Sequence, residues 1–101
     1  MASTLNALGE LHYRKNDPRG AVPYFEQALE IRRKRLGPRD PIVAQSLFNI
    51  GMALEKSGDG RGAEARFREA LAIWLERLGP DHPSVKAVRN EIAGLEAKSS
   101  K

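Results

Sequence analysis

The side chains that most often carry catalysis are sparse in this sequence. It contains two histidines, His12 and His82, and no cysteine. A thiolate nucleophile, a disulfide and a thiolate metal site are therefore excluded, and two histidines alone do not make a zinc site. No Gly-x-x-x-x-Gly-Lys loop occurs that could cradle a phosphate, and Gly58-Asp59-Gly60 lacks the other oxygen ligands of a calcium loop. We expect no catalytic residues, no metal and no cofactor.

The strongest charge feature is a basic run, Arg32-Arg33-Lys34-Arg35, with Arg39 beyond it. On a helix these four consecutive side chains point around most of the circumference, so they form no single stripe that could follow a phosphate backbone. Basic residues near a helix C-terminus also interact favourably with the helix dipole. The formal charge of +4, with 30% of residues charged, describes a mixed surface. We do not expect nucleic acid to be a partner.

Length and hydropathy indicate how many domains the chain can form and whether it is a membrane protein. At 101 residues the chain is one domain at most, and it is close to the size at which a single core is marginally sufficient. No apolar run approaches the roughly twenty residues that span a bilayer, and the N-terminus lacks a basic region followed by an apolar stretch. These features predict a soluble, cytoplasmic protein without a membrane partner.

The sequence matches itself when it is shifted by forty-two residues. Leu36-Gly37-Pro38 recurs as Leu78-Gly79-Pro80. The same shift superposes identical residues in both halves: Leu5 on Leu47, Gly9 on Gly51, Asp17 on Asp59, Ala21 on Ala63, Phe25 on Phe67 and Ala28 on Ala70. A period of this size indicates stacked copies of one unit, because a unit that cannot bury its apolar face alone buries it against its neighbour. This organisation favours a binding scaffold over an enzyme.

Helix start and stop signals recur at equivalent points. Asp17-Pro18 predicts an N-cap followed by a first helical residue that has no N–H to satisfy. Asp40-Pro41 repeats this start, and Asp59 can cap a helix from Gly60. Gly37-Pro38 ends a helix through a left-handed glycine, and Gly58 supplies a positive φ in the turn between paired helices.

These signals predict an all-α fold of five helices, made of two antiparallel pairs and a terminal helix. We place repeat one at about 2–37, repeat two at about 42–79 and the terminal helix at about 83–97, in a single domain over 1–97 with a disordered tail at 98–101. The terminal helix carries an apolar stripe of Val85, Val88, Ile92 and Leu95. Its polar outer face is typical of a helix that seals the end of a stack. A chain cut from a longer array would look the same.

The spaced small and apolar residues of both copies resemble the signature of the tetratricopeptide repeat. In the first copy they are Leu5, Leu8, Gly9, Ala21, Phe25 and Ala28; in the second they are Leu47, Ile50, Gly51, Ala63, Phe67 and Ala70. The forty-two-residue period and the Leu-Gly-Pro-x-x-Pro connector are similar to the kinesin light chain type. The resemblance implies a right-handed α-solenoid that acts as a non-catalytic protein-protein interaction module.

Packing explains the same pattern. Gly9 and Gly51 are small where two helices of a pair approach closely, and Phe25 and Phe67 are expected to fill the space between one pair and the next. His12 occupies a place where the family often has tyrosine. We interpret His12 as a packing residue with a polar tip.

The resemblance also implies a concave groove, lined by the first helix of each pair, in which a partner lies. Helix geometry turns one polar face of these helices away from the leucine stripe. The residues assigned to this peptide-binding groove are Asn6, Glu10, Tyr13, Gln45, Phe48, Asn49, Met52 and Lys56. Ser3, Arg14 and Glu55 share these faces, and Ala87, Asn90 and Glu91 of the terminal helix could join them.

Individual groove residues indicate which kinds of partner segment the groove could bind. Asn49 matches an asparagine that many peptide-binding members place in the groove, where its amide can donate to and accept from a peptide backbone. The basic clamp for an acidic C-terminal tail is not matched, because Asn6, Glu10, Ala87 and Glu91 stand at its other positions. Phe48 and Met52, one turn apart and predicted to be exposed, instead suggest an apolar anchor site for an extended or helical segment.

Two alternatives stay open at this point. Phe48 and Met52 could pack against a neighbouring copy or against further repeats, and Trp74 could either cover the terminal helix or contact a second copy. The predicted function is binding of a peptide or helical segment of a partner protein; the alternative is a self-assembling or dimerising segment of a larger protein.

Overall fold

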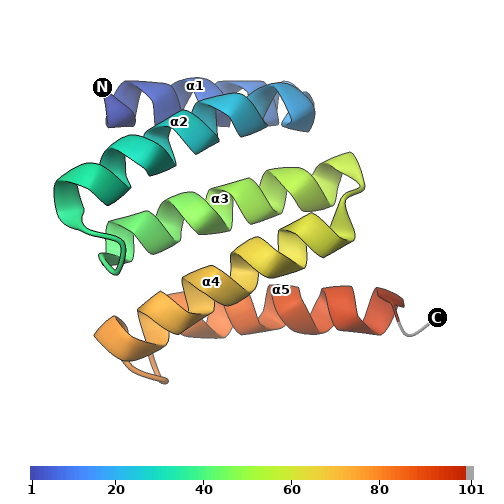
Figure 1. Ribbon diagram of the computed structural model, residues 1–101. Helices are drawn as coiled ribbons and strands as arrows, with labels where there is room; N and C mark the ends of the chain where they lie inside the picture. Colours follow the sequence, from blue (N-terminus) through green and yellow to red (C-terminus); the bar gives the residue numbers. More distant parts are fainter. Residues whose placement is uncertain (100–101) are drawn as a thin grey trace.

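The helical prediction is confirmed. The computed structural model describes residues 1–99, and within them the chain forms five helices and no strand: α1 (Ala2–Arg14), α2 (Pro18–Leu36), α3 (Pro41–Ser57), α4 (Gly60–Leu78) and α5 (Pro83–Ser99). The helices run back and forth in a single stack (Figure 1). Each helix packs chiefly against its neighbours in the sequence. Within residues 1–99 the molecule is therefore an all-α solenoid of two helix pairs followed by a single helix.

One boundary differs from the sequence prediction. α5 includes Lys98 and Ser99, the first two residues of the predicted disordered tail. The other two residues of that tail, 100–101, lie outside the described residues. No helix within residues 1–99 combines the length and the apolar character that crossing a membrane requires.

The predicted caps form as expected. The carboxylates of Asp17 and Asp59 accept hydrogen bonds from the backbone N–H groups of Gly20 and Gly62, at 3.0 and 2.9 Å. Asp40 accepts from the N–H of Ile42 at 2.8 Å. At the start of α5 the equivalent position is His82, whose Nδ1 accepts from the N–H of Ser84 at 3.1 Å. These bonds satisfy N–H groups that a helix start otherwise leaves without a partner.

The turns separate into two backbone types. Gly58, between the paired helices α3 and α4, has φ 99° and ψ 3°, which is the predicted left-handed conformation. Asn16 takes the equivalent place between α1 and α2 with φ 70°. Gly37 and Gly79 also have positive φ, but their ψ values of 152° and 163° lie in a region that essentially only glycine adopts. The left-handed helical conformation predicted for Gly37 is therefore wrong in ψ, although the need for glycine is confirmed.

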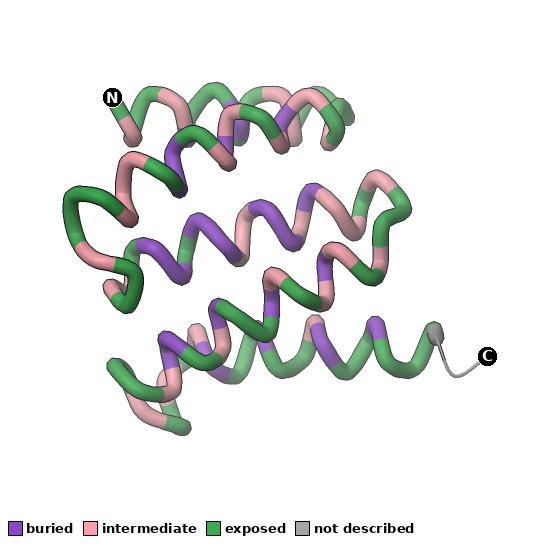
Figure 2. Tube along the Cα trace, viewed as in Figure 1, coloured by how far each residue is buried: buried purple, intermediate pink, exposed green. Residues whose placement is uncertain are grey.

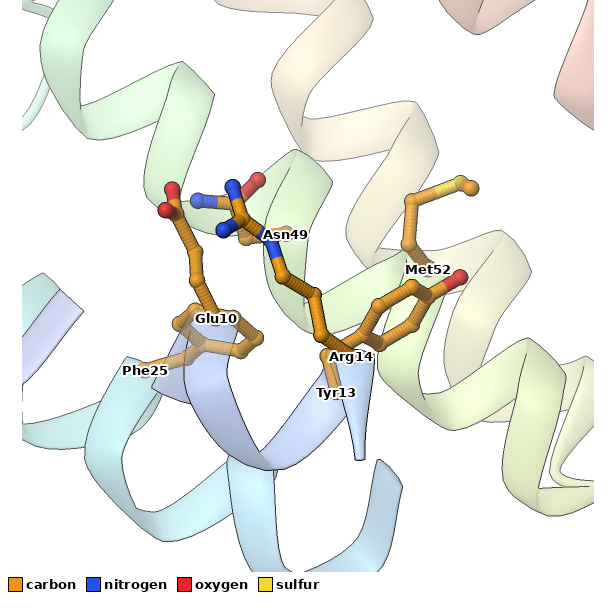
Figure 3. A pocket seen from close by; sticks show the side chains of 6 residues that line it. All are labelled: Glu10, Tyr13, Arg14, Phe25, Asn49 and Met52. Carbon is orange, nitrogen blue, oxygen red and sulfur yellow. The ribbon is translucent and has the colours of Figure 1, made fainter. Parts of the chain in front are cut away.

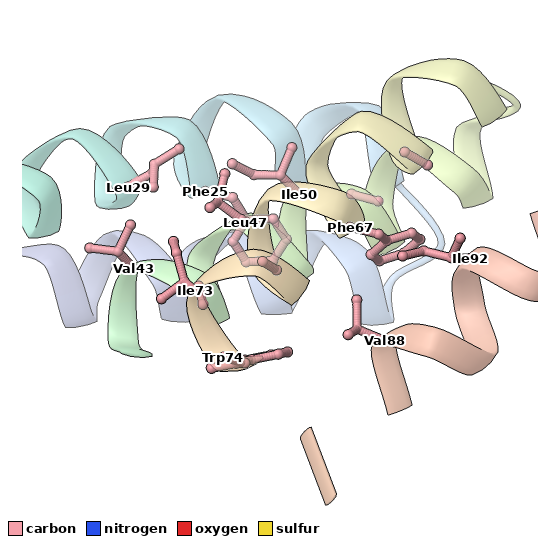
Figure 4. Close-up of a cluster of buried hydrophobic side chains, with 14 of the residues drawn as sticks. Phe25, Leu29, Val43, Leu47, Ile50, Phe67, Ile73, Trp74, Val88 and Ile92 are labelled. Carbon is pink, nitrogen blue, oxygen red and sulfur yellow. The ribbon is translucent and has the colours of Figure 1, made fainter. Parts of the chain in front are cut away.

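Glycine and phenylalanine pack against one another inside each helix pair. A Cβ built on Gly9 would lie 2.5 Å from Cε1 of Phe25, and one built on Gly51 would lie 2.6 Å from Cε1 of Phe67. Both distances are shorter than any normal carbon contact, so the rings rest directly on the glycine backbone. Phe67 is completely buried in a core that runs through the stack from α2 to α5 (Figure 4). Each phenylalanine ring thus packs between the two helices of its own pair and also belongs to the common core.

Trp74 belongs to the core. The residue is 7% exposed, and its Nε1–H donates to the carbonyl oxygen of Pro41 at 3.1 Å. Phe48 lies beside it, with ring centroids 5.8 Å apart, and also contacts Phe67 at 5.3 Å. Phe48, which the sequence predicts to be exposed, is therefore half-buried in an aromatic cluster, because the indole and Phe67 cover much of its ring.

The basic run is divided among several partners. Arg32 donates to the hydroxyl of Ser46 at 2.8 Å, Arg33 pairs with Glu69 at 3.3 Å, and Lys34 pairs with Glu30 at 3.9 Å. These contacts point in different directions, as consecutive residues on a helix must. His12 stacks on Tyr24 with a centroid distance of 5.2 Å, and its Nδ1 lies 3.1 Å from a carboxylate oxygen of Asp17. The packing role with a polar tip is confirmed for His12.

Candidate functional site

A chain of side-chain amides and a carboxylate connects α3 to α1. Asn49 donates from Nδ2 to Oδ1 of Asn6 at 3.1 Å, and Asn6 donates from its own Nδ2 to Oε1 of Glu10 at 3.1 Å. Asn6 is only 9% exposed, so both of its polar ends are used internally. Asn6 therefore positions Asn49 and does not itself offer a surface for a partner. No hydrogen bond found within residues 1–99 uses the Oδ1 atom of Asn49.

An apolar hollow opens beside Asn49. Its volume is about 140 Å³, and it is lined by side chains from α1, α2 and α3: Glu10, Tyr13, Arg14, Phe25, Asn49 and Met52. Figure 3 shows Glu10 and Arg14 reaching to the side of Asn49, with the Tyr13 ring next to Met52. Four of the predicted groove residues thus line one concavity. Its dimensions suit one aliphatic side chain.

Phe25 is the lining residue that the sequence does not assign to the site. It comes from α2, the second helix of a pair, whereas the groove is expected to be lined by first helices. Its ring reaches the hollow because Gly9 has no side chain to cover it. The repeated glycine and phenylalanine pairing is the sequence signal that could have indicated this floor.

One end of the groove carries a cluster of charges around Tyr13. The ammonium of Lys56 lies 4.6 Å from the centre of the Tyr13 ring, a cation–π contact. Burial, followed by the charges of Glu55 and Glu91, raises the pKa of the Tyr13 phenol above its usual value. Lys98 lies 3.8 Å from Glu55. Tyr13 therefore stays a neutral hydrogen-bond donor at the rim of the hollow.

Glu91 of α5 meets Glu55 of α3 across this end. Burial, a hydrogen bond with Glu55 and the charge of Glu55 together raise the pKa of Glu91, and Lys98 opposes the shift. A carboxyl with a raised folded-state pKa lowers stability at every pH above its unfolded value near 4.3, because ionisation costs more in the folded state.

Replacing Glu91 with glutamine is therefore expected to stabilise the protein at neutral pH. Because the position is partly open to solvent, the gain in the free energy of unfolding should be no more than about 0.5 kcal/mol. The gain should shrink as the pH falls through the raised folded-state pKa of Glu91, and it should vanish only below the unfolded value near 4.3, where the carboxyl is protonated in both states. Urea unfolding at a series of pH values measures this, with Glu30→Gln as a control that lacks the gain. A loss of stability, or a gain that does not vary with pH, would contradict the electrostatic argument.

The remaining predicted residues lie outside the hollow. Gln45 is exposed on the first half of α3. Phe48 is directed into the aromatic cluster with Phe67 and Trp74. Lys56 lies at the charged end, on Tyr13. The structure brings Glu10, Tyr13, Asn49 and Met52 together, supports them with Asn6, and separates them from Gln45 and Phe48.

The arrangement defines a class of protein. Antiparallel helix pairs that repeat every forty-two residues, share one core and leave a lined hollow on the first helices form an α-helical repeat scaffold. A family model described as tetratricopeptide repeat matches residues 1–76. Because this match covers more than half of the sequence, the chain belongs to the tetratricopeptide repeat family. Members of this family generally act as protein-protein interaction modules and are typically non-catalytic.

Two solved structures share the fold. One is BtubC (BKLC) from P. vanneervenii, with a TM-score of 0.88 and 22% identity over 97% of this chain and 39% of that one. The other is a Podosopora anserina putative kinesin light chain with nearly identical TPR-like repeats, with a TM-score of 0.83 and 22% identity over 97% of this chain and 46% of that one. This chain therefore spans less than half the length of either. No curated protein matches the sequence.

Proposed function

We propose that this chain is a non-catalytic module that binds a segment of a partner protein in the groove across α1 and α3. The observation that carries the proposal is the amide of Asn49, held by Asn6 at the mouth of an apolar hollow. An amide carbonyl fixed in this way can accept a hydrogen bond from the backbone of a bound segment. The hollow then receives one of its apolar side chains.

The arrangement favours an extended segment with one apolar anchor. A cavity of about 140 Å³ holds a single side chain, and most of the affinity of an interface comes from a few such anchors. The flexible thioether of Met52 can adapt to anchors of different shape. Tyr13 supplies a second donor at the rim. Specificity would then come from the register between the anchor and the backbone groups that face Asn49 and Tyr13.

Selection from a displayed peptide library tests this function. A selected peptide should lose about tenfold in affinity for Asn49→Ala, the equivalent of one hydrogen bond, and a similar amount for Met52→Ala. Lys34→Ala, an exposed change on α2 away from the hollow, should bind like the parent protein. Helicity should differ little among the three variants. Asn49→Ala leaves Oδ1 of buried Asn6 without its donor, and Met52 packs against the core, so affinities are compared at a temperature at which each variant is fully folded. Equal affinity of the parent protein and both groove variants for every selected peptide would exclude the groove as the binding site.

A further inference from the structure

The start of α5 is capped by a histidine, whereas α2, α3 and α4 are capped by aspartates. His82 stands at the position of Asp40, forty-two residues earlier, and each is followed by a proline that opens the helix. The Nδ1 atom of His82 accepts from the backbone N–H of Ser84 at 3.1 Å, just as Asp40 accepts from Ile42. An imidazole has thus replaced a carboxylate as the acceptor that satisfies the helix start.

A histidine can hold this hydrogen bond only while its ring is neutral. A ring nitrogen that accepts carries no proton, so the neutral ring of His82 has its proton on Nε2. A second proton, on Nδ1, would set the ring N–H against the N–H of Ser84, and both are donors. It would also place a positive charge at a helix N-terminus, where the helix dipole disfavours it. In general, a histidine takes up this proton at about pH 6.5, whereas a carboxylate stays ionised down to about pH 4.

No carboxylate is placed to offset a positive charge on His82. The charged side chains nearest to it along the chain, from the end of α4 to the first turn of α5, are Glu76, Arg77, Asp81 and Lys86. Glu76 is already held by Arg39 from the connector between α2 and α3. Asp81 is exposed, and no ion pair found within residues 1–99 includes His82. Protonation of this ring therefore removes the cap without supplying a new partner.

The other histidine is placed for the opposite response. Nδ1 of His12 lies 3.1 Å from a carboxylate oxygen of Asp17. A proton on this ring completes an ion pair, because the two charges are then opposite and close together. Acid thus strengthens the turn between α1 and α2 and weakens the start of α5, so the two histidines act in opposite directions.

The attachment of α5 depends on one narrow face. Its buried residues are Val85, Val88, Ile92 and Leu95, and most positions between them are exposed (Figure 2). Within residues 1–99 it packs chiefly on α4. Further along the helix, Glu91 and Lys98 meet Glu55 of α3 at the charged end of the groove. A weaker start of α5 therefore loosens the element that carries these charges.

We propose that His82 is a pH-sensitive cap, which holds α5 on the stack while the ring is neutral and loosens the helix when the ring is protonated. The groove hollow is lined only by residues of α1, α2 and α3. The cap can therefore be tested separately from the binding of a partner segment.

Amide hydrogen exchange of the full chain tests the proposal in the parent protein, His82→Asn and His82→Ala. Asparagine accepts a hydrogen bond at any pH without taking up a proton, and alanine accepts none. Protection factors of Val88 and Ile92 are compared at about pH 7.5 and about pH 5, on either side of the ordinary histidine value. Other groups that titrate in this range act on all three proteins, so their effects cancel in the ratio of parent to variant.

We expect the parent to match His82→Asn at the higher pH and His82→Ala at the lower pH. The ratio of parent to His82→Asn protection should therefore fall about fivefold, as the loss of one helix cap requires. His12→Gln is the control, and it should leave this fall unchanged. The same ratio at both pH values, or a His82→Ala protein that equals the parent at about pH 7.5, would overturn the proposal. So would a fall that disappears in His12→Gln, because the response would then belong to the other histidine.

Discussion

Replacing Phe67 with alanine is expected to lower the free energy of unfolding by about 3–5 kcal/mol. The ring is completely buried, rests on Gly51 and contacts Phe48, so its removal leaves a cavity that the surrounding helices cannot close fully. A domain of this size has only about 5–15 kcal/mol in total. The variant should therefore unfold at a much lower urea concentration than the parent protein.

Phe48→Ala is the matched comparison for this prediction. Phe48 belongs to the same aromatic cluster but is half-buried, so its truncation should cost clearly less than that of Phe67. Urea unfolding followed by circular dichroism measures both. Equal losses for the two phenylalanines, or a loss below about 1 kcal/mol for Phe67, would contradict the packing described for the core.

The second large effect is that two glycine-to-alanine substitutions are expected to change the free energy of unfolding in opposite directions. Gly94→Ala should stabilise the protein by about 1 kcal/mol, because alanine is the better helix former and a new Cβ there meets no atom within 4 Å. Gly51→Ala should destabilise it. The new methyl would lie 2.6 Å from Phe67, and the resulting overpacking costs about 1–3 kcal/mol, which exceeds the gain in propensity.

Thermal or urea unfolding of the two alanine variants checks this contrast. Both changes add one methyl group to the middle of a helix, so the intrinsic preference for alanine cancels in the comparison. A stabilising Gly51→Ala would mean that the helices of a pair can separate at no cost. That outcome would remove close approach over glycine as the reason for the repeated residue.

The repeat could be predicted from the sequence because the sequence signals of its helices are local or periodic. Aspartate caps, positive-φ glycines and the forty-two-residue spacing of Gly9 and Gly51 each act within a turn or a single helix pair. They predict the five helices, and the predicted bounds of the two repeats and of the terminal helix agree with the structure within two residues. Backbone geometry was less accessible: the sequence indicates that Gly37 needs a positive φ, whereas its ψ depends on the path between α2 and α3.

The candidate site was predicted less completely, because its details depend on contacts between distant residues. Asn6 is drawn inward by Asn49, forty-three positions away, and no local pattern reveals that hydrogen bond. Phe48 is half-covered because the second repeat has Trp74 where the first has Arg32, and the indole turns towards the start of α3. The approach of Glu91 to Glu55 likewise requires α5 to pack in the stack.

The burial of equivalent positions also depends on how the helices assemble. On the sequence, Leu8 counts as a core position, because its equivalent in the second repeat is Ile50. In the structure Ile50 is 1% exposed and Leu8 is 37% exposed, because α2 packs on α3 and no helix within residues 1–99 covers the equivalent face of α1. Equivalent apolar positions of the two repeats thus differ in burial, with one in the core and the other on the surface.

We propose above all that the groove of α1 and α3 binds a partner segment through Asn49 and the adjacent hollow. Its most direct test is the amide and methyl chemical-shift map of the chain titrated with a library-selected peptide. We expect the largest changes at Tyr13, at the side-chain amide of Asn49 and at the methyl group of Met52. Changes confined to the outer faces of α2 and α4, with these three signals unmoved at saturation, would contradict the claim.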